Sequence, residues 1–354
     1  MTRLDQLRES MQDEGFNTLV VHARNNVRYL SGFTGSNGTL VVSGADCILV
    51  TDARYAIQAP RELASAGIDG EVRLGKGEGL AEVLEAAASA TSLGFEGAHV
   101  TWNQAKRLED AFEGEVIATT GLVEALRERK DPDEIAAMRN AARIADTALG
   151  EVVPLIAAGN SERHIAAALD AAARAGGADG SAFETIVASG PNAARPHHRP
   201  SDRVVEDGDL VIIDFGALAQ GYRSDMTRSF LIGGGTSQQR EMLDAVRMAQ
   251  QAGVDRSGPG VPVADVDAAC REVLAAADLD EWFTHGTGHG VGLDIHEAPW
   301  VNARATATLA AGHVITVEPG VYIPEVGGVR WEDTIVITEE GSESLTNFPK
   351  SPQR

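Results

Sequence analysis

The amino-acid sequence predicts a two-domain protein of the α+β fold class, in which helices and strands are mixed. Its 354 residues exceed the roughly 250–300 residues at which a single hydrophobic core usually stops growing. The first part alternates short β-branched runs with helical runs, and the second part repeats one order twice, two helical runs followed by two apolar strands. We therefore expect a smaller α/β domain followed by a larger α+β domain.

The expected strands of the first domain are short and rich in β-branched residues. They are NTLVVH, GTLVVSG, ADCILVTD and EVIATT, and turn-forming residues join them. The run LAEVLEAAASA and residues 102–112 have the apolar spacing of helices. Together these runs predict a compact α/β unit.

A charge-rich stretch, LRERKDPDEI, marks the expected domain boundary. Pro132 suits the first position of a helix, and Asp131 before it suits the N-cap. We assign residues 1–127 to the first domain and residues 128–354 to the second.

Composition narrows the range of partners. The chain has 52 acidic and 30 basic residues, a net charge of −22, so a phosphate backbone would be repelled and no nucleic-acid partner is expected. No apolar run approaches the ~20 residues of a membrane span, and the start MTRLDQLRES lacks a signal-peptide pattern. We expect a soluble, cytoplasmic protein with no membrane partner. Cys47 and Cys270 lie in apolar runs without metal or redox spacing, and we expect both in the core.

Four carboxylates recur at matching places in the second domain. Asp214 ends the run DLVIIDFGA and Asp225 lies in YRSDMTRSF, whereas Glu318 lies in HVITVEPGVY and Glu332 in VRWEDTIVI. Each pair follows two helical runs, residues 134–157 and 161–175 in the first half and residues 237–252 and 263–277 in the second. This order suggests a duplicated helix–helix–hairpin unit with one carboxylate in each strand.

These carboxylates need cations nearby, because burying one ionised carboxylate without a partner costs several kcal/mol. Arg223, Arg228 and Arg330 are near in sequence and could pair with them, or strand ends could leave them in water. Two divalent cations explain the pattern better, since oxygen ligands with one imidazole suit Mn, Co or Zn.

The stretch HGTGHGVGLDIHE, residues 285–297, can supply that imidazole. In it His289 is flanked by Gly288 and Gly290, which allow the backbone to approach an ion closely.

Several motifs, taken in order, resemble those of the pita-bread metallopeptidases, in the branch of Xaa-Pro aminopeptidases and Xaa-Pro dipeptidases (prolidases). They are SGPNAARPHH, IIDFGA, SDMTRSF, HGTGHGVGLDIHE, TVEPGVY and GGVRWEDT, with YLSGFTGSNG, TDARY and LGFE in the first domain. The resemblance implies a C-terminal pita-bread (creatinase/aminopeptidase) catalytic domain and a smaller N-terminal creatinase-like α/β domain. It also implies a homodimer.

The resemblance further implies two divalent cations per chain, with manganese expected and cobalt or zinc as alternatives. The implied ligands are Asp214, Asp225, His289, Glu318 and Glu332. Asp225 and Glu332 would bridge both cations, Asp214 would complete one site, and His289 with Glu318 would complete the other.

Residues of the catalytic cleft follow from the same resemblance. His197, His285 and His296 would contact the peptide carbonyl or the oxyanion, and Glu318 would also act as general base. His198 would be a neighbour without a catalytic role. Tyr322 and Arg330 match positions near the proline ring.

The expected activity is removal of the N-terminal residue from peptides with proline in second position. Prolidases typically have HE-x-P-Arg, with the arginine on the dipeptide carboxylate, but this chain has HEAPW. Trp300 in that place favours an Xaa-Pro aminopeptidase. The alternative is a dipeptidase with an arginine from elsewhere, and more remote alternatives are a metal-free peptide-binding module or a creatine-type amidinohydrolase.

Overall fold

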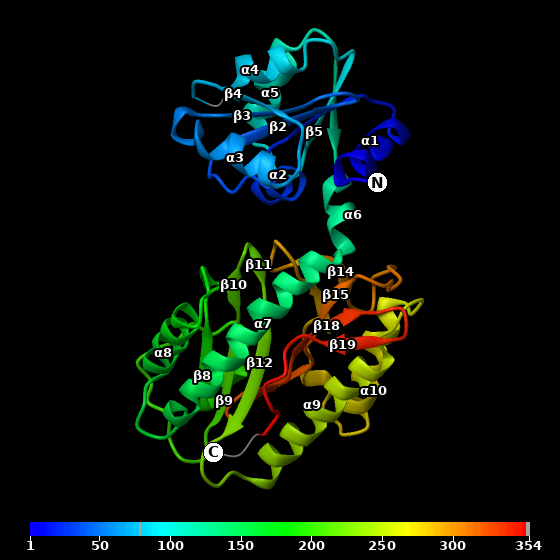
Figure 1. Ribbon diagram of the computed structural model, residues 1–354. Coiled ribbons are helices and arrows are strands. Elements are labelled where there is room, and N and C mark those ends of the chain that lie inside the picture. Colours follow the sequence, from blue (N-terminus) through cyan, green and yellow to red (C-terminus); the bar gives the residue numbers. More distant parts are fainter. Residues whose placement is uncertain (78, 352–354) are drawn as a thin grey trace. The chain divides into compact units, whose positions relative to one another are not determined.

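The computed structural model describes residues 1–77 and 79–351, and these fall into two compact units (Figure 1). One unit ends at Arg127 and the other begins at Glu128. Helix α6 (Leu122–Glu128) contains the boundary. In this described part, no helix combines the length and the apolar character that a membrane span needs.

The first unit is built on one six-stranded mixed sheet. In the order β4-β3-β2-β1-β5-β6, its strands are Glu71–Leu74, Cys47–Thr51, Gly38–Ser43, Thr18–Val21, Ser92–Glu96 and Glu115–Thr119. Strands β1, β2 and β3 pair antiparallel, and the remaining pairs are parallel. The helices are α1 (Arg3–Asp13), α2 (Arg24–Ser31), α3 (Gln58–Ser65), α4 (Leu80–Ala86) and α5 (Trp102–Ala111), with a 3-10 turn η1 (Ala53–Tyr55).

The second unit contains the predicted pairs of helices. They are α7 (Pro132–Val152) with α8 (Glu162–Ala175), and α9 (Ser237–Arg256) with α10 (Val263–Ala275). The Asp131 side chain accepts hydrogen bonds from the backbone of Asp133 and Glu134, and Pro132 opens α7, so the predicted helix start is confirmed. Three 3-10 turns complete the helical elements, η2 (Val153–Leu155), η3 (Gly190–Ala194) and η4 (Asp280–Trp282).

Two main sheets lie in the second unit, one for each half of the duplication. The first has the order β12-β9-β8, made of Met226–Leu231, Leu210–Phe215 and Ile186–Ser189. The second has the order β14-β13-β15-β18-β19, made of Glu297–Val301, Gly288–Gly290, Val314–Val317, Asp333–Ile337 and Ser342–Ser344. Smaller sheets join β7 (Gly180–Ser181), β10 (Ala217–Ala219) and β11 (Tyr222–Arg223), and join β16 (Gly320–Ile323) to β17 (Gly327–Arg330).

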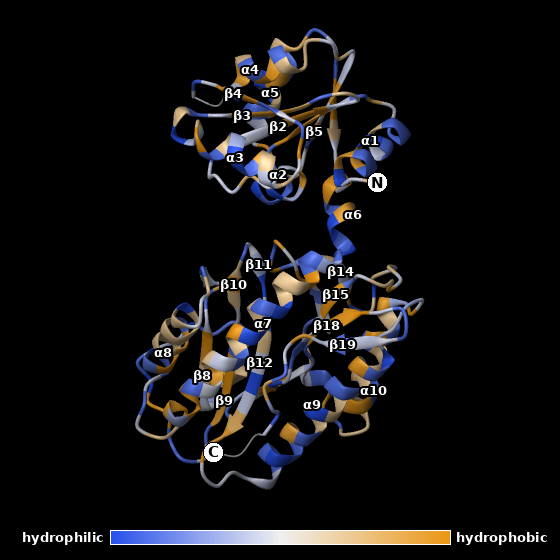
Figure 2. Cartoon of the chain, in the orientation of Figure 1, coloured by the Kyte–Doolittle hydropathy of each residue, from blue (hydrophilic) through white to orange (hydrophobic). Residues whose placement is uncertain are grey.

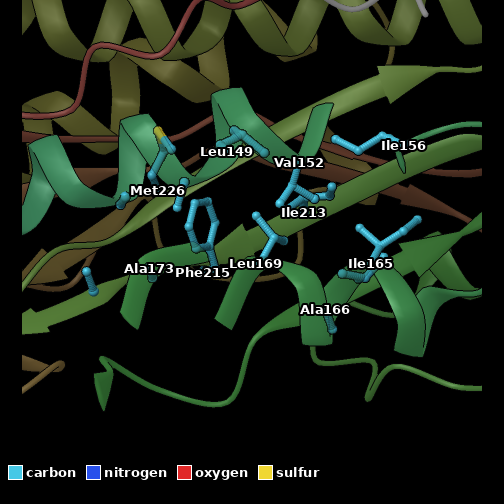
Figure 3. Packing of buried hydrophobic residues seen from close by; sticks show 14 of the residues in the cluster. Leu149, Val152, Ile156, Ile165, Ala166, Leu169, Ala173, Ile213, Phe215 and Met226 are labelled. Carbon is cyan, nitrogen blue, oxygen red and sulfur yellow. The ribbon is translucent and has the colours of Figure 1, made fainter. Parts of the chain in front are cut away.

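Each half packs its helices on its own sheet. Leu149 and Val152 of α7 and Leu169 of α8 meet Ile213 and Phe215 of β9 in one buried cluster (Figure 3). A second cluster joins α9 and α10 to strands of the second half, around the fully buried Trp331. Strands β8 and β9 are hydrophobic along most of their length, whereas α9 and α10 also carry hydrophilic residues (Figure 2). Cys47 and Cys270 are buried free thiols, as predicted.

The four carboxylates are not all inside strands, which corrects the sequence prediction. Asp214 lies in β9, but Asp225 immediately precedes β12, Glu318 immediately follows β15 and Glu332 immediately precedes β18. The ladders explain these places, because Met226 pairs with Phe215 and Val317 pairs with Asp333 at the ends of their strand pairs. The carboxylates therefore collect where two ladders end.

Candidate metal centre

Three of the predicted ligands form one compact group. Asp225, His289 and Glu332 are buried, and one ligand atom from each lies within 4.8 Å of the others. Asp225 immediately precedes β12, His289 lies in β13 and Glu332 immediately precedes β18. The fold thus brings both halves of the second unit to a single point.

The two other predicted ligands adjoin this group. His289 Nε2 lies 3.2 Å from Glu318 Oε1 and 3.7 Å from Asp225 Oδ2. Asp214 Oδ2 accepts a hydrogen bond from Arg330 Nη2 at 2.6 Å. Among the described residues, the other oxygen of Asp214, Oδ1, is buried without a hydrogen-bond donor. A buried carboxylate oxygen in that state is available to a cation.

Arginine side chains compensate part of the negative charge of these carboxylates. Arg330 pairs with Asp214, but Arg228 pairs with Asp333 at 2.8 Å and donates to backbone carbonyls. Arg223 donates to the carbonyl oxygens of Ala182 and Leu293. The arginines near these motifs therefore also stabilise the strands around the site.

The electrostatics favour a further positive charge. Burial, and then the charges of Glu332, Asp214 and Glu318, raise the pKa of Asp225 well above its ordinary value. Burial, and then Glu318 and Asp214, do the same to the pKa of Glu332. Mutual repulsion of this kind is relieved when a divalent cation replaces the protons.

Glu318 and His289 lie within hydrogen-bonding distance, and each shifts the pKa of the other. Burial opposes ionisation of Glu318, but the hydrogen bond and charge of His289 outweigh it and lower the pKa of Glu318 to about 2. Burial lowers the pKa of His289, and Glu318 more than reverses this effect, so the net shift is upward. The donors of this centre, carboxylates with one imidazole and an oxygen left without a partner, fit a hard or borderline divalent cation.

Two threonines that the sequence interpretation missed hold these ligands. Thr227 Oγ1 donates to Glu332 Oε2 at 2.7 Å, and Thr316 Oγ1 donates to Glu318 Oε1 at 3.0 Å. His289 Nδ1 lies 3.0 Å from the Gly290 carbonyl, which fixes the ring with Nε2 facing the carboxylates. A threonine in an apolar strand looks like an ordinary strand residue, so no sequence signal distinguished them.

The glycines beside His289 have a packing role that the sequence did not indicate. A Cβ on Gly288 would collide with the Thr316 carbonyl, and one on Gly290 would collide with the Ala298 carbonyl. Glycine is thus required because strands β14 and β15 approach β13 closely.

A cavity of about 1160 Å³ opens over the centre. Its lining includes all five predicted ligands and the predicted cleft residues His197, His285, His296, Trp300 and Arg330. The ring of His296 stands edge-on to His289, with centroids 4.4 Å apart, and the half-exposed Trp300 ring lies 6.4 Å from His289. Arg199, Arg271 and Arg304, which the sequence interpretation did not select, also line the cavity.

Tyr322 and His285 are more enclosed than predicted. Tyr322 is buried and is not among the residues that line the cavity. Its hydroxyl lies 2.8 Å from Arg330 Nη1 and 2.9 Å from His285 Nε2. His285 Nδ1 lies 2.8 Å from the Gly286 carbonyl, so both ring nitrogens have partners within the protein. Burial lowers the pKa of His285, which keeps the ring neutral.

A two-domain chain with buried carboxylates and an imidazole beneath an open cleft has the features of a metallopeptidase. The chain matches the model of metallopeptidase family M24 over residues 136–339 and that of the creatinase/prolidase N-terminal domain over residues 3–129. It therefore belongs to metallopeptidase family M24 and is an enzyme. Its fold, a creatinase-like domain followed by a pita-bread catalytic domain, is the predicted one.

Relatives span almost the whole chain. A Bacillus subtilis (strain 168) protein named uncharacterized peptidase YqhT is 38% identical over 352 residues, which cover 98% of each chain. The structure of an Xaa-Pro dipeptidase from Bacillus anthracis has a TM-score of 0.96 and 36% identity, covering 99% of this chain and 98% of that one. An X-Pro aminopeptidase from Thermotoga maritima MSB8 has a TM-score of 0.90 and 35% identity, covering 100% and 99%.

Proposed function

We propose that this chain is an exopeptidase that uses two divalent cations to remove the N-terminal residue from peptides with proline in second position. The observation that most supports this function is the buried group of Asp225, His289 and Glu332 at the base of a histidine-lined cavity. The names of relatives, Xaa-Pro dipeptidase and X-Pro aminopeptidase, support the preference for proline.

The proposed ligands are Asp214, Asp225, His289, Glu318 and Glu332. Among the ligands that would hold the cations, Asp225 and Glu332 most need a positive charge, since both are buried and each is repelled by neighbouring carboxylates. Manganese is the cation we propose, with cobalt and zinc as alternatives for the same donors. When bound, such a pair acidifies a water molecule and polarises the scissile carbonyl.

The remaining steps belong to side chains of the cleft. Glu318, ionised because of His289, would take a proton from the attacking water and pass it to the leaving prolyl nitrogen. His197 and His296 would donate hydrogen bonds to the peptide carbonyl or the oxyanion. His285 would assist by holding the Tyr322 hydroxyl, to which Arg330 also donates, or by exchanging this partner for the substrate.

Trp300 supports cleavage of peptides longer than two residues. Its half-exposed indole lies in the cavity at the place where prolidases typically carry an arginine. An indole cannot form an ion pair with the free carboxylate of a dipeptide. The C-terminal end of a dipeptide would therefore gain no selective contact from Trp300.

A dipeptidase is the second candidate, and two observations favour it. Several relatives have that name, and Arg199 and Arg304 line the same cavity. Either guanidinium could bind a substrate carboxylate in place of the missing arginine.

Turnover of matched substrates separates these candidates. We expect the purified protein with manganese to cleave Ala-Pro-Ala and Ala-Pro-amide at least as well as Ala-Pro. A dedicated dipeptidase would instead lose about 1.5–3 kcal/mol, roughly ten- to a hundredfold in kcat/KM, when the amide replaces the carboxylate. The substitution Trp300→Arg should shift the preference towards Ala-Pro.

Cleavage of Ala-Pro alone would contradict the aminopeptidase proposal. Arg304→Gln and Arg199→Gln would then identify the group that binds the carboxylate.

We also propose a homodimer, which the creatinase-like first domain supports and light scattering can test.

A further inference from the structure

The segment that carries His197 is tied to a buried carboxylate of helix α8. Glu162 is fully buried at the first residue of α8. Its Oε1 accepts hydrogen bonds from Ser189 N, Ser189 Oγ and Asn192 Nδ2, at 2.8, 2.8 and 2.9 Å. Its Oε2 lies 2.8 Å from His198 Nε2 and accepts from Ser201 N and Oγ at 3.0 and 2.6 Å. One carboxylate therefore holds both ends and the middle of residues 189–201.

This arrangement requires an ionised carboxylate. Burial opposes ionisation of Glu162, but the hydrogen bonds from Ser201, Asn192, His198 and Ser189 outweigh it and lower its pKa to about 2. A neutral amide fits this place poorly, because the end that carries its NH2 group would face a backbone N–H, that of Ser189 or that of Ser201.

The geometry connects this anchor to the cleft. His197 and His198 both line the cavity over the metal centre, and of the two it is His198 whose Nε2 contacts Glu162, with 8% of its side chain exposed. From the cleft side, Arg330 Nη1 reaches the carbonyl of Pro196 at 3.4 Å. The residues on either side of His197 are thus held from opposite directions.

The second half of the unit contains a parallel arrangement. Asp267 of α10 is fully buried, accepts from Thr287 N and Oγ1 at 3.2 and 2.8 Å, and pairs with Arg271 at 2.8 Å. Arg271 in turn donates to the carbonyl of His285 at 2.7 Å. In both halves, a buried carboxylate on the second helix holds a segment that carries a cleft histidine.

We propose that Glu162 is a positioning residue for peptide hydrolysis, which fixes residues 189–201 through His198 so that His197 reaches the substrate. This inference rests on the proposed function, in which His197 contacts the substrate. Glu162 is not among the residues that line the cavity over the metal centre.

A double-mutant cycle on kcat tests the proposal. Glu162→Gln should lower kcat for Ala-Pro-Ala about 10- to 100-fold, since a displacement near 1 Å can cost that much, and KM and bound metal should change little. In a His197→Ala background the same substitution should have almost no further effect on kcat, because the two residues act together. Asp202→Asn, which breaks only the exposed pair with Arg163, is the matched control and should behave like the wild type.

If Glu162→Gln does not fold, two less disruptive substitutions test the same proposal. His198→Ala removes one donor, and it should lower kcat by less than His197→Ala does. His198→Gln, which keeps a donor, should recover most of that loss. Loss of kcat that multiplies in the double variant, loss of bound metal, or full activity of both Glu162→Gln and His198→Ala would overturn the proposal.

Amide hydrogen exchange separates this inference from the proposed function. Glu162→Gln, or His198→Ala if the former is unfolded, should speed exchange in residues 195–201 and leave strands β9 and β12 unchanged. If the wild type cleaves no Xaa-Pro peptide, the proposed function fails. Unchanged exchange in residues 195–201 would overturn the anchoring role whatever the activity.

Discussion

Asp225 and Glu332 illustrate how one side chain can determine two properties of this enzyme. Each is buried, and each has its pKa raised by burial and by the neighbouring carboxylates. A charge held in this way is costly to the folded chain unless a cation compensates it. The same charge is what a divalent cation needs.

Removing either charge should therefore remove the metal. We expect Asp225→Asn and Glu332→Gln each to bind manganese more than about 100-fold more weakly, because even residues that only support ligands contribute 10–100-fold, and to lose activity. Elemental analysis and turnover measure the two effects, with the exposed Glu340→Gln as a control of equal charge change. An active Asp225→Asn protein with two metals per chain would refute the five-ligand assignment.

His313 lies in positively charged surroundings, whereas Asp225 and Glu332 lie among negative charges. It is buried, and its Nδ1 accepts a hydrogen bond from Ala310 N at 3.2 Å. Burial, and then the charges of Lys130 and Arg129, lower its pKa to about 4. The folded chain therefore resists protonation of this ring, whereas the unfolded chain takes up the proton near pH 6.5.

Stability should consequently fall as pH drops from about 6.5 to about 4, by at most about 3 kcal/mol from this residue. Urea unfolding across this pH range measures the loss. His313→Asn, which keeps an acceptor for Ala310, should flatten the dependence, and the exposed His164→Asn should not. Equal slopes for the wild type and His313→Asn would show that His313 does not control this loss.

Among the helices and strands, the long periodic ones could be predicted from the sequence. Helices α8, α9 and α10 begin where their caps or apolar spacing indicated, and β1, β2, β3 and β6 coincide with β-branched runs. Strand β4 could not be predicted, because its four residues are largely exposed and show no apolar run. Strands β10 and β11 are too short to carry a periodic signal.

The sequence indicated residues that the fold brings together around the cavity, but not the side chains that support them. The order of motifs indicated five ligand positions. The apolar runs placed the four carboxylates inside strands, whereas Asp225, Glu318 and Glu332 lie just beyond strand ends. Glu162 resembles the acidic residue commonly found in the first turn of a helix, so its four partner residues could not be foreseen. Those partners come from residues 189–201, and only tertiary packing brings them to α8.

For the enzyme as a whole, the proposed metal centre depends on both halves of the duplicated unit. Asp214 and Asp225 come from the first half, and His289, Glu318 and Glu332 come from the second. Because the ligands meet only in the folded chain, cation binding should add to folding stability, and a chelator should lower the melting temperature. The excess negative charge of −22 should strengthen this effect at low ionic strength.

The most direct test is to titrate metal-free protein with manganese while following the hydrolysis of Ala-Pro-Ala. We expect no turnover without metal, and activity that reaches its full value as two cations bind per chain, with Asp225→Asn inactive throughout. Full activity of the metal-free protein would contradict the proposed metal-dependent exopeptidase. Full activation by manganese that leaves the cleft without a bound cation would contradict it too.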